Sequence, residues 1–284
     1  MGAFVRVYKD NLRTASLCRR LSAIVIAVAL SFAATACADD EGATVGGVAL
    51  VKKGQLTTCT NIPYPPFQLQ QSGQVVGFDI DMIALVAKGL GVPQKIIDTP
   101  FETIKGGAAL NSGKCDVAAA GMSIKPERAK FIDFSIPYFN AEQALMAKRE
   151  SGISSLDDVQ KRKLKLGALA GTTGEDLVKG RGFDPRSFDN SQAELDALRT
   201  GQIDVLVQDD PVVRYWLKDP ANRDFVLVTK LRTDQQYGFA VRKDHNPMLL
   251  RVINETIERA KRDGTYERIY EKWMGPMPAG VMPS

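Results

Sequence analysis

The sequence predicts an α/β protein made of two similar lobes. Short apolar segments alternate with segments of helical period along most of the chain, which is typical of parallel βαβ units. A helix end, a Gly turn, an Asp and an apolar strand follow one another at 109–121, and again at 197–209. This repeat indicates a second lobe of the same kind. Strands expected at 143–149 and 235–243 connect the lobes twice and predict a hinge.

The elements of the first lobe follow from its apolar pattern and its turn residues. Apolar residues recur at helical spacing from Ile80 to Leu90, with Asp79 as the expected N-cap. The proline-rich segment 61–67 predicts an irregular loop. We expect strands at 56–60, 94–98 and 115–121, a helix at 79–90, a helix that ends near 113, and a helix that begins at 126.

The second lobe repeats this order, and the chain then returns to the first lobe. We expect strands at 164–171 and 203–210, helices at 173–180, 191–201 and 211–218, and one long helix at 248–273. These assignments place 49–145 and 238–284 in the first lobe and 146–237 in the second lobe.

The N-terminal segment has the composition of an export signal. A basic region ends at residue 20, and an apolar run of about 16 residues follows it, shorter than the roughly 20 residues that span a bilayer. Residues 1–36 resemble a bacterial lipoprotein signal peptide, with Cys37 as the lipid-modified first residue of the mature chain. The position three before Cys37 holds Ala34 in place of the usual Leu, so a plain secretory signal is the alternative.

The mature chain is therefore expected at the extracytoplasmic face of a bacterial cell membrane, anchored by lipid. Residues 37–48 are small, acidic and rich in Gly, which predicts a flexible tether. The formal net charge of the whole chain is +4. Residues 1–36 carry five basic residues and one acidic residue, so they account for all of it. The neutral remainder gives no reason to expect nucleic acid as a partner.

The four cysteines fall into different classes. Cys18 leaves with the signal and Cys37 takes the lipid, so Cys59 and Cys115 remain in an oxidising compartment, where we expect a disulfide. A metal site is the alternative, but two Cys with His245 as the one histidine of the chain are poor ligands for zinc. We expect no metal and no cofactor.

Several short motifs, taken in order, carry a family resemblance. They are YPPF, GFDID, LNSGKCDVAAAGMSIKPER, FSIPYF, GTTGED, QIDVLVQD, YGFAVRK and DGTYERIYEKW. In this order they resemble family 3 of the extracellular solute-binding proteins, the polar-amino-acid receptors of ABC importers, over about residues 48–275. The resemblance implies a type II periplasmic-binding-protein fold, the Venus flytrap, with two hinge crossings. Such a fold closes on one free amino acid and passes it to a permease in the membrane.

The resemblance implies that Arg128 and Asp209 hold the two charges of this amino acid, which is a zwitterion. Arg128 lies on the first turn of a helix, where a cation opposes the helix dipole, and its planar fork can bind a carboxylate bidentately. Asp209 follows a buried strand, at the carboxyl end where open α/β sheets place their ligands. Asp210 is the alternative anion, but it more simply caps the next helix.

Further residues are expected around this pair. By similarity to the family, Ser123 and Thr173 add donors for the carboxylate, and the Gly121 carbonyl and the Ser123 hydroxyl accept from the ammonium. Tyr64 and Phe101 lie in loops after strands, where binding residues gather, and are expected to wall the pocket.

The side-chain specificity rests on residues that depart from the family's patterns. Receptors for basic amino acids, and those for glutamine, tend to carry Asp where this chain has Asn61, and glutamine receptors carry a Lys where this chain has Leu169. Asn61 and Gln208 suit an uncharged amide or a sulfur amino acid such as cystine. Lys125 either points to solvent or reaches an acidic side chain.

Two other functions remain open from the sequence. The first is an enzyme of this fold, such as a dehydratase, although the sequence holds no Ser–His–Asp set and no phosphate-binding loop. The second is an amino-acid sensor lipoprotein that works without a transporter. We expect a monomeric receptor that is not an enzyme.

Overall fold

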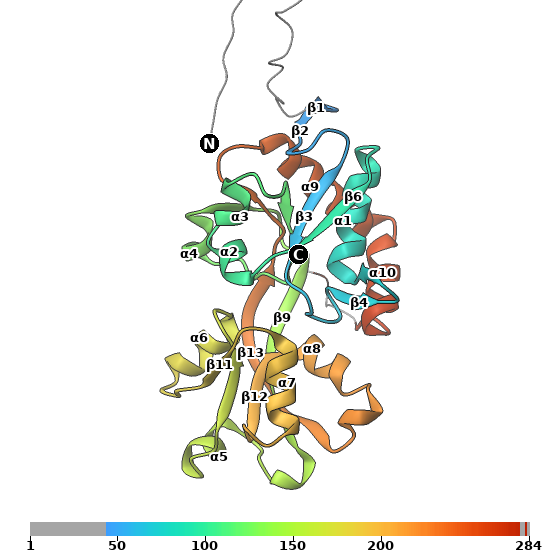
Figure 1. Cartoon of the computed structure of the whole chain (residues 1–284). Helices are drawn as coiled ribbons and strands as arrows, with labels where there is room; N and C mark the ends of the chain where they lie inside the picture. The colour runs from blue at the N-terminus through green and yellow to red at the C-terminus, as the bar shows by residue number, and fades with distance from the viewer. Residues whose placement is uncertain (1–43, 279–281, 283–284) are drawn as a thin grey trace, which may run out of the picture. The chain divides into compact units, whose positions relative to one another are not determined.

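The computed structural model describes residues 44–278 and 282, and it has two lobes, each built on a mixed five-stranded sheet (Figure 1). The predicted two-lobed α/β fold is confirmed. The predicted signal peptide and Cys37 lie outside the described residues. The last residues of the predicted tether belong to a short hairpin of β1 (Thr44–Val45) and β2 (Val48–Ala49). In the part of the chain that is described, no helix is both long and apolar enough to cross a membrane.

The first lobe has the strand order β6-β3-β7-β14-β8. These strands are β6 (Gln94–Asp98), β3 (Leu56–Thr60), β7 (Val117–Ala118), β14 (Ala240–Arg242) and β8 (Ile132–Phe134). β4 (Leu69–Gln71) and β5 (Gln74–Val76) form a separate two-stranded hairpin. The helices are α1 (Phe78–Gly89), α2 (Phe101–Lys105), α3 (Ala108–Asn111), α4 (Pro126–Ala129), α9 (Pro247–Arg262) and α10 (Thr265–Met274).

The second lobe has the strand order β11-β10-β12-β9-β13. These strands are β11 (Arg186–Phe188), β10 (Leu166–Leu169), β12 (Val205–Asp209), β9 (Phe139–Lys148) and β13 (Phe225–Tyr237). The helices are α5 (Leu156–Lys161), α6 (Thr173–Gly180), α7 (Ser191–Arg199) and α8 (Asp210–Trp216), with 3₁₀ turns at η1 (Arg149–Ser151) and η2 (Pro220–Asn222).

Two features of the fold differ from the sequence prediction. The sheets are not purely parallel, because β9, β13 and β14 pair antiparallel with their neighbours. β9 and β14 enter a sheet directly from the other lobe, without the crossover helix that a parallel neighbour needs, and β13 runs back along β9 toward the first lobe. The single helix expected at 248–273 is two helices, since Gly264 between them adopts a left-handed φ of 74° that ends the first helical run.

The hinge consists of β9 and β13, which pair along their length and connect the lobes (Figure 1). Tyr237 lies opposite Phe139 at one end of the pair, and Phe225 lies opposite Lys148 at the other. The expected strand 235–243 is two strands, because the chain leaves β13 at Tyr237 and joins the first sheet at β14. The ladder between these strands is interrupted by register shifts at Leu227/Thr229 and Leu231/Gln235, and two such connecting strands form a hinge between the lobes.

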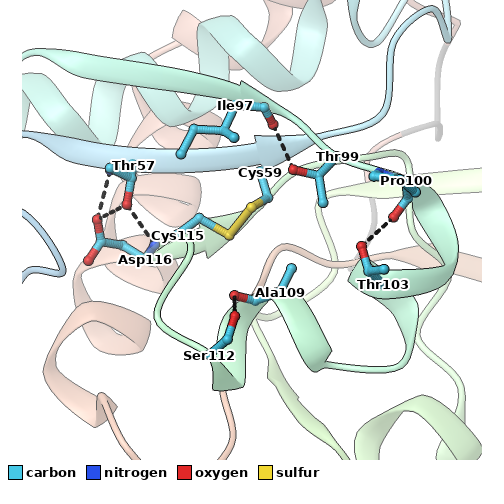
Figure 2. The surroundings of a disulfide bond; sticks show 10 residues. All are labelled: Thr57, Cys59, Ile97, Thr99, Pro100, Thr103, Ala109, Ser112, Cys115 and Asp116. Atoms are coloured by element: carbon cyan, nitrogen blue, oxygen red, sulfur yellow. Dashed lines mark hydrogen bonds between the residues drawn. A yellow bond between two sulfur atoms is a disulfide. The ribbon is translucent and has the colours of Figure 1, made fainter.

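A disulfide joins the first sheet near its centre, as predicted. Cys59 on β3 bonds to Cys115, which lies two residues before the neighbouring strand β7, and their Cα atoms are 5.7 Å apart (Figure 2). Beside it, the carboxylate of Asp116 accepts hydrogen bonds from the backbone N–H of Thr57 (2.7 Å) and from its hydroxyl (2.5 Å). The covalent bond and the carboxylate therefore tie the same two strands together at adjacent positions.

We expect removal of the disulfide to destabilise the chain without changing the fold. The bond closes a loop with a sequence separation of 56 residues, for which the chain-entropy model gives about 4 kcal/mol. A variant with both Cys59→Ala and Cys115→Ala should lose roughly 2–5 kcal/mol of unfolding free energy in urea titrations. The mass of the unreduced wild-type chain should be lower by two hydrogens than that of the reduced chain. Two free thiols in the mature protein would refute the pairing.

Candidate ligand-binding site

One small cavity between the lobes is lined by every sequence-predicted ligand residue except Gln208. From the first lobe its lining comprises Asn61, Tyr64, Gln68, Phe101, Ala120, Gly121, Ser123 and Arg128, and from the second lobe Leu169, Thr172, Thr173 and Asp209. Most of these residues lie at or just beyond the carboxyl ends of parallel strands. The carboxyl-terminal edges of both sheets therefore face the cavity, and this is the edge at which open α/β sheets bind their ligands.

Arg128 supplies the positive charge of this cavity and is 6% exposed. From α4 its guanidinium donates to the Ser123 carbonyl (3.0 Å) and, across the cavity, to the Gly171 carbonyl of the second lobe (3.3 Å). Its Cζ lies 5.4 Å from the centre of the Phe101 ring. Within the described residues Arg128 forms no ion pair, and burial lowers its pKa from the usual value. A buried cation with free N–H groups is a strong site for an anion.

Asp209 supplies the negative charge from the end of β12 and is 5% exposed. Its carboxylate accepts hydrogen bonds from the hydroxyls of Tyr64 and Tyr237 and from the side-chain amide of Gln143. Burial raises the pKa of the Asp209 carboxyl, while these donors and Arg128 oppose the rise. Asp210, the alternative anion, pairs with Arg214 (2.9 Å) and does not line the cavity.

The two charges come from different lobes and do not pair with each other. The free volume between the lining side chains is about 20 Å³, which corresponds to roughly one water molecule. A free amino acid is much larger, so its entry requires the lobes to separate. The hinge strands permit this motion, and the dipolar arrangement suits a small molecule with one charge of each sign.

Sequence reasoning missed several residues of the site, those that line the cavity and those that contact Asp209 from the hinge: Gln68, Ala120, Leu169, Thr172, Gln143 and Tyr237. Gln143 and Tyr237 lie in the hinge strands β9 and β13, and both donate to Asp209. Gln143 also lies 3.5 Å from the Thr173 hydroxyl. Gln68 lines the cavity and is fully buried. One of these residues could have been found from the sequence, because Gln143 is a polar residue that directly precedes the apolar run ALMA.

Gln208 lies beside the cavity without lining it. Its side-chain oxygen accepts from the Asp209 backbone N–H (2.9 Å) and lies 2.8 Å from the Tyr64 hydroxyl, whose one proton is donated to Asp209. Its amide donates to the buried carboxyl of Glu194 (2.9 Å). It therefore contacts Tyr64 and α7, which places it behind the residues that line the site.

The loop after β10 brings the second lobe against the first. Gly171 has a left-handed φ of 69°, and a Cβ there would lie 2.1 Å from Glu102 Oε1 and 2.2 Å from Lys105 Nζ of the first lobe. Lys105 donates to the Gly171 carbonyl at 3.1 Å. Of the two alternatives for Lys125, the structure favours the acidic partner, since its ammonium lies 2.8 Å from Asp176 of α6. These contacts form only when the lobes are close together.

Asp79 has a different role from the predicted N-cap. Helix α1 begins after Gly77, and Asp79 lies within its first turn, fully buried. Its carboxylate accepts from the Gly121 backbone N–H (2.8 Å) and from the Tyr138 hydroxyl (2.8 Å). It therefore fixes the backbone of a cavity-lining residue. Burial raises the pKa of Asp79 from 3.8 to about 7, against the opposing effect of these two donors.

Comparison with known proteins identifies the family. The model of the bacterial extracellular solute-binding proteins, family 3, matches residues 56–276. The match covers most of the chain, and the chain belongs to this family, as its motifs predicted. The family consists of extracellular or periplasmic binding proteins.

Named relatives of this chain bind amino acids. The ABC transporter glutamine-binding protein GlnH of Bacillus subtilis is 34% identical over 211 residues, which cover 73% of this chain and 76% of that protein. The L-cystine-binding protein TcyJ of Escherichia coli K12 is 31% identical over 229 residues, which cover 79% of this chain and 84% of that protein. An ancestral arginine-binding protein bound to glutamine matches with a TM-score of 0.72 at 40% identity, covering 78% of this chain and 99% of that chain. The predicted periplasmic-binding-protein fold is thereby confirmed.

We expect the buried carboxyl of Asp79 to make stability fall as the pH rises. Its pKa is higher in the folded chain than in the unfolded chain, so the folded state holds the extra proton between about pH 4 and pH 7. The contribution of Asp79 is complete below pH 4 and is lost as the pH passes through 7. Within that window it changes the unfolding free energy by at most about 1.4 kcal/mol per pH unit.

The measurement is urea unfolding of the wild type and of Asp79→Asn from pH 4 to pH 8. The Asn side chain does not titrate, so the variant should show a shallower decline over this window. Since the other buried carboxyls are unchanged, the difference between the two curves isolates Asp79. Parallel curves would show that Asp79 does not carry this proton.

Proposed function

We propose that this chain is a receptor that binds one free amino acid with an uncharged polar side chain between its lobes and delivers it to an ABC permease. The observation that supports the proposal most directly is the pair of buried, opposite charges of Arg128 and Asp209, which line one cavity from two lobes without pairing. A zwitterion satisfies both charges at once, whereas a simple anion or a simple cation leaves one of them unpaired.

In the proposed complex, the α-carboxylate lies against the Arg128 fork. Thr173 adds a backbone N–H from the first turn of α6, where the helix dipole favours an anion. The α-ammonium binds Asp209, with the Ser123 hydroxyl and the Gly121 carbonyl as further acceptors. These two ends of the ligand connect the lobes and so favour closure.

The charge balance of the cavity favours a ligand with an uncharged side chain. Among the lining residues, Arg128 is the one basic side chain and Asp209 the one carboxylic acid, and the main-chain groups of the ligand pair with both. A cationic or anionic side chain then meets no opposite charge in a desolvated site, which is costly. Relatives include binding proteins for glutamine, arginine and L-cystine and a probable histidine-binding protein. Ligands with an uncharged side chain, such as glutamine, are therefore within the range of the family.

A location of this chain outside the cytoplasm agrees with the family, whose members are extracellular or periplasmic. The predicted lobe boundaries, at 145/146 and 237/238, fall on the hinge strands β9 and β13. Cys37 anchors the mature chain to the membrane by lipid, and 37–48 lets the lobes reach the permease. The chain acts as a monomer and returns its ligand chemically unchanged, unlike an enzyme of the same fold.

We expect an uncharged polar amino acid to raise the melting temperature of the mature chain. At 100 times its dissociation constant, a ligand that binds only the folded state adds about 2.7 kcal/mol, which is several degrees. The measurement is thermal unfolding against each of the twenty L-amino acids and L-cystine. No shift with any of them would refute the receptor. In a separate incubation, conversion of the added amino acid to another product would favour the enzyme.

We expect Arg128→Ala to weaken binding of the amino acid found in this way by roughly 2–5 kcal/mol, because the ligand carboxylate is left buried and unpaired. Arg128→Lys is the matched control, since it keeps the charge and loses the planar fork. Its affinity should lie between those of the wild type and Arg128→Ala. Titration calorimetry checks this order, and an Arg128→Ala variant within twofold of the wild type would remove Arg128 from the site.

A further inference from the structure

Gln68 holds a side-chain oxygen for which the described part of the chain offers no donor. It follows the proline-rich loop and is fully buried. Its backbone is fixed by reciprocal hydrogen bonds with Tyr64, at 2.7 Å and 3.0 Å. Its side-chain Nε2 donates to the Asn61 carbonyl at 3.2 Å, and its Oε1 is buried without a hydrogen-bond partner. A buried amide oxygen without a donor is uncommon in folded proteins and calls for an explanation.

The orientation of this amide follows from its partner. A backbone carbonyl can only accept, so the nitrogen of Gln68 must face Asn61 and the oxygen must face away. Because Gln68 lines the cavity, Oε1 is the polar atom that it can offer to a ligand.

Asn61, which is half-buried, offers a second oxygen to the same wall of the cavity. Its Nδ2 donates to the Thr99 carbonyl at 3.2 Å, which fixes the amide with the nitrogen toward β6 and its loop. Among residues 44–278 and 282, its Oδ1 has no hydrogen-bond donor. Asn61 and Gln68 thus bring two neutral acceptors to the first-lobe wall of the cavity.

We infer that Gln68, together with Asn61, selects an amino acid whose side chain carries a carboxamide. This inference rests on the proposed amino-acid receptor and specifies its ligand. A carboxamide NH₂ group has two donors and no charge, so it can satisfy both oxygens without introducing an ion. An aliphatic or thioether side chain leaves both oxygens unpaired, and a guanidinium brings a charge that neutral oxygens compensate only in part.

The test is titration calorimetry of the mature chain with L-glutamine, L-asparagine, L-arginine and L-cystine. We expect the wild type to bind one of the two amides at least tenfold more tightly than L-arginine or L-cystine. Gln68→Leu should weaken the preferred amide about tenfold, since one neutral hydrogen bond is lost and the pocket becomes more apolar. Gln68→Glu should weaken the amide and gain affinity for L-arginine, because the new carboxylate pairs with the guanidinium.

Gln71→Leu and Gln71→Glu are the matched controls. Gln71 lies on β4, is exposed and does not line the cavity, so both changes should leave every affinity within twofold of the wild type. If Gln68→Leu and Gln68→Glu also leave amide affinity within twofold, the inference is overturned. A wild type that prefers L-arginine or L-cystine overturns it as well.

These outcomes are distinct from failure of the receptor itself. If the wild type binds an amino acid and Arg128→Ala abolishes that binding, the receptor stands whichever ligand is preferred. If the wild type binds none of the twenty amino acids or L-cystine, the proposed function fails first, and the specificity of Gln68 fails with it.

Discussion

The burial of two opposite charges that do not touch each other is the constraint on which this structure depends. Removing an ion from water costs several kcal/mol unless a partner is found. Arg128 obtains two carbonyl oxygens and an aromatic face, and Asp209 obtains two hydroxyls and an amide. These neutral contacts keep each charge in place without neutralising it. A zwitterion can neutralise both charges at once.

The sheet topology places these charges on opposite sides of one cavity. Parallel strands in each lobe end at the cavity, and the residues just beyond them supply its walls. The antiparallel pair of β9 and β13 connects the lobes and also contributes Gln143 and Tyr237 to Asp209. The hinge is therefore part of the electrostatic environment of the site as well as its mechanical support. A change in the angle between the lobes therefore alters the hydrogen bonds to the Asp209 carboxylate.

The sequence predicted those parts of the fold and site that local patterns determine. Strand–helix alternation and the repeat at 109–121 and 197–209 indicated the two lobes, and strand ends indicated where Asp209 lies. Gln143 and Tyr237 were not predicted, because only the pairing of two distant strands brings them to Asp209. The N-cap expected at Asp79 was wrong because tertiary donors from Gly121 and Tyr138 compete with local capping. Gln208 precedes Asp209 on β12, and both side chains approach the Tyr64 hydroxyl, but the Gln208 amide also donates to Glu194 of α7, which holds it behind the cavity lining.

In the proposed receptor, affinity is set by a competition for Asp209. Tyr64 from the first lobe, Gln143 and Tyr237 from the hinge strands and a ligand ammonium all donate to, or would donate to, the same carboxylate. A ligand shifts the lobes toward closure only by the difference between its own contacts and those it displaces. The main-chain charges of any amino acid make nearly the same contribution to this difference. Discrimination between amino acids therefore falls to the neutral walls of the cavity, where the hydrogen-bonding match of the side chain decides the outcome.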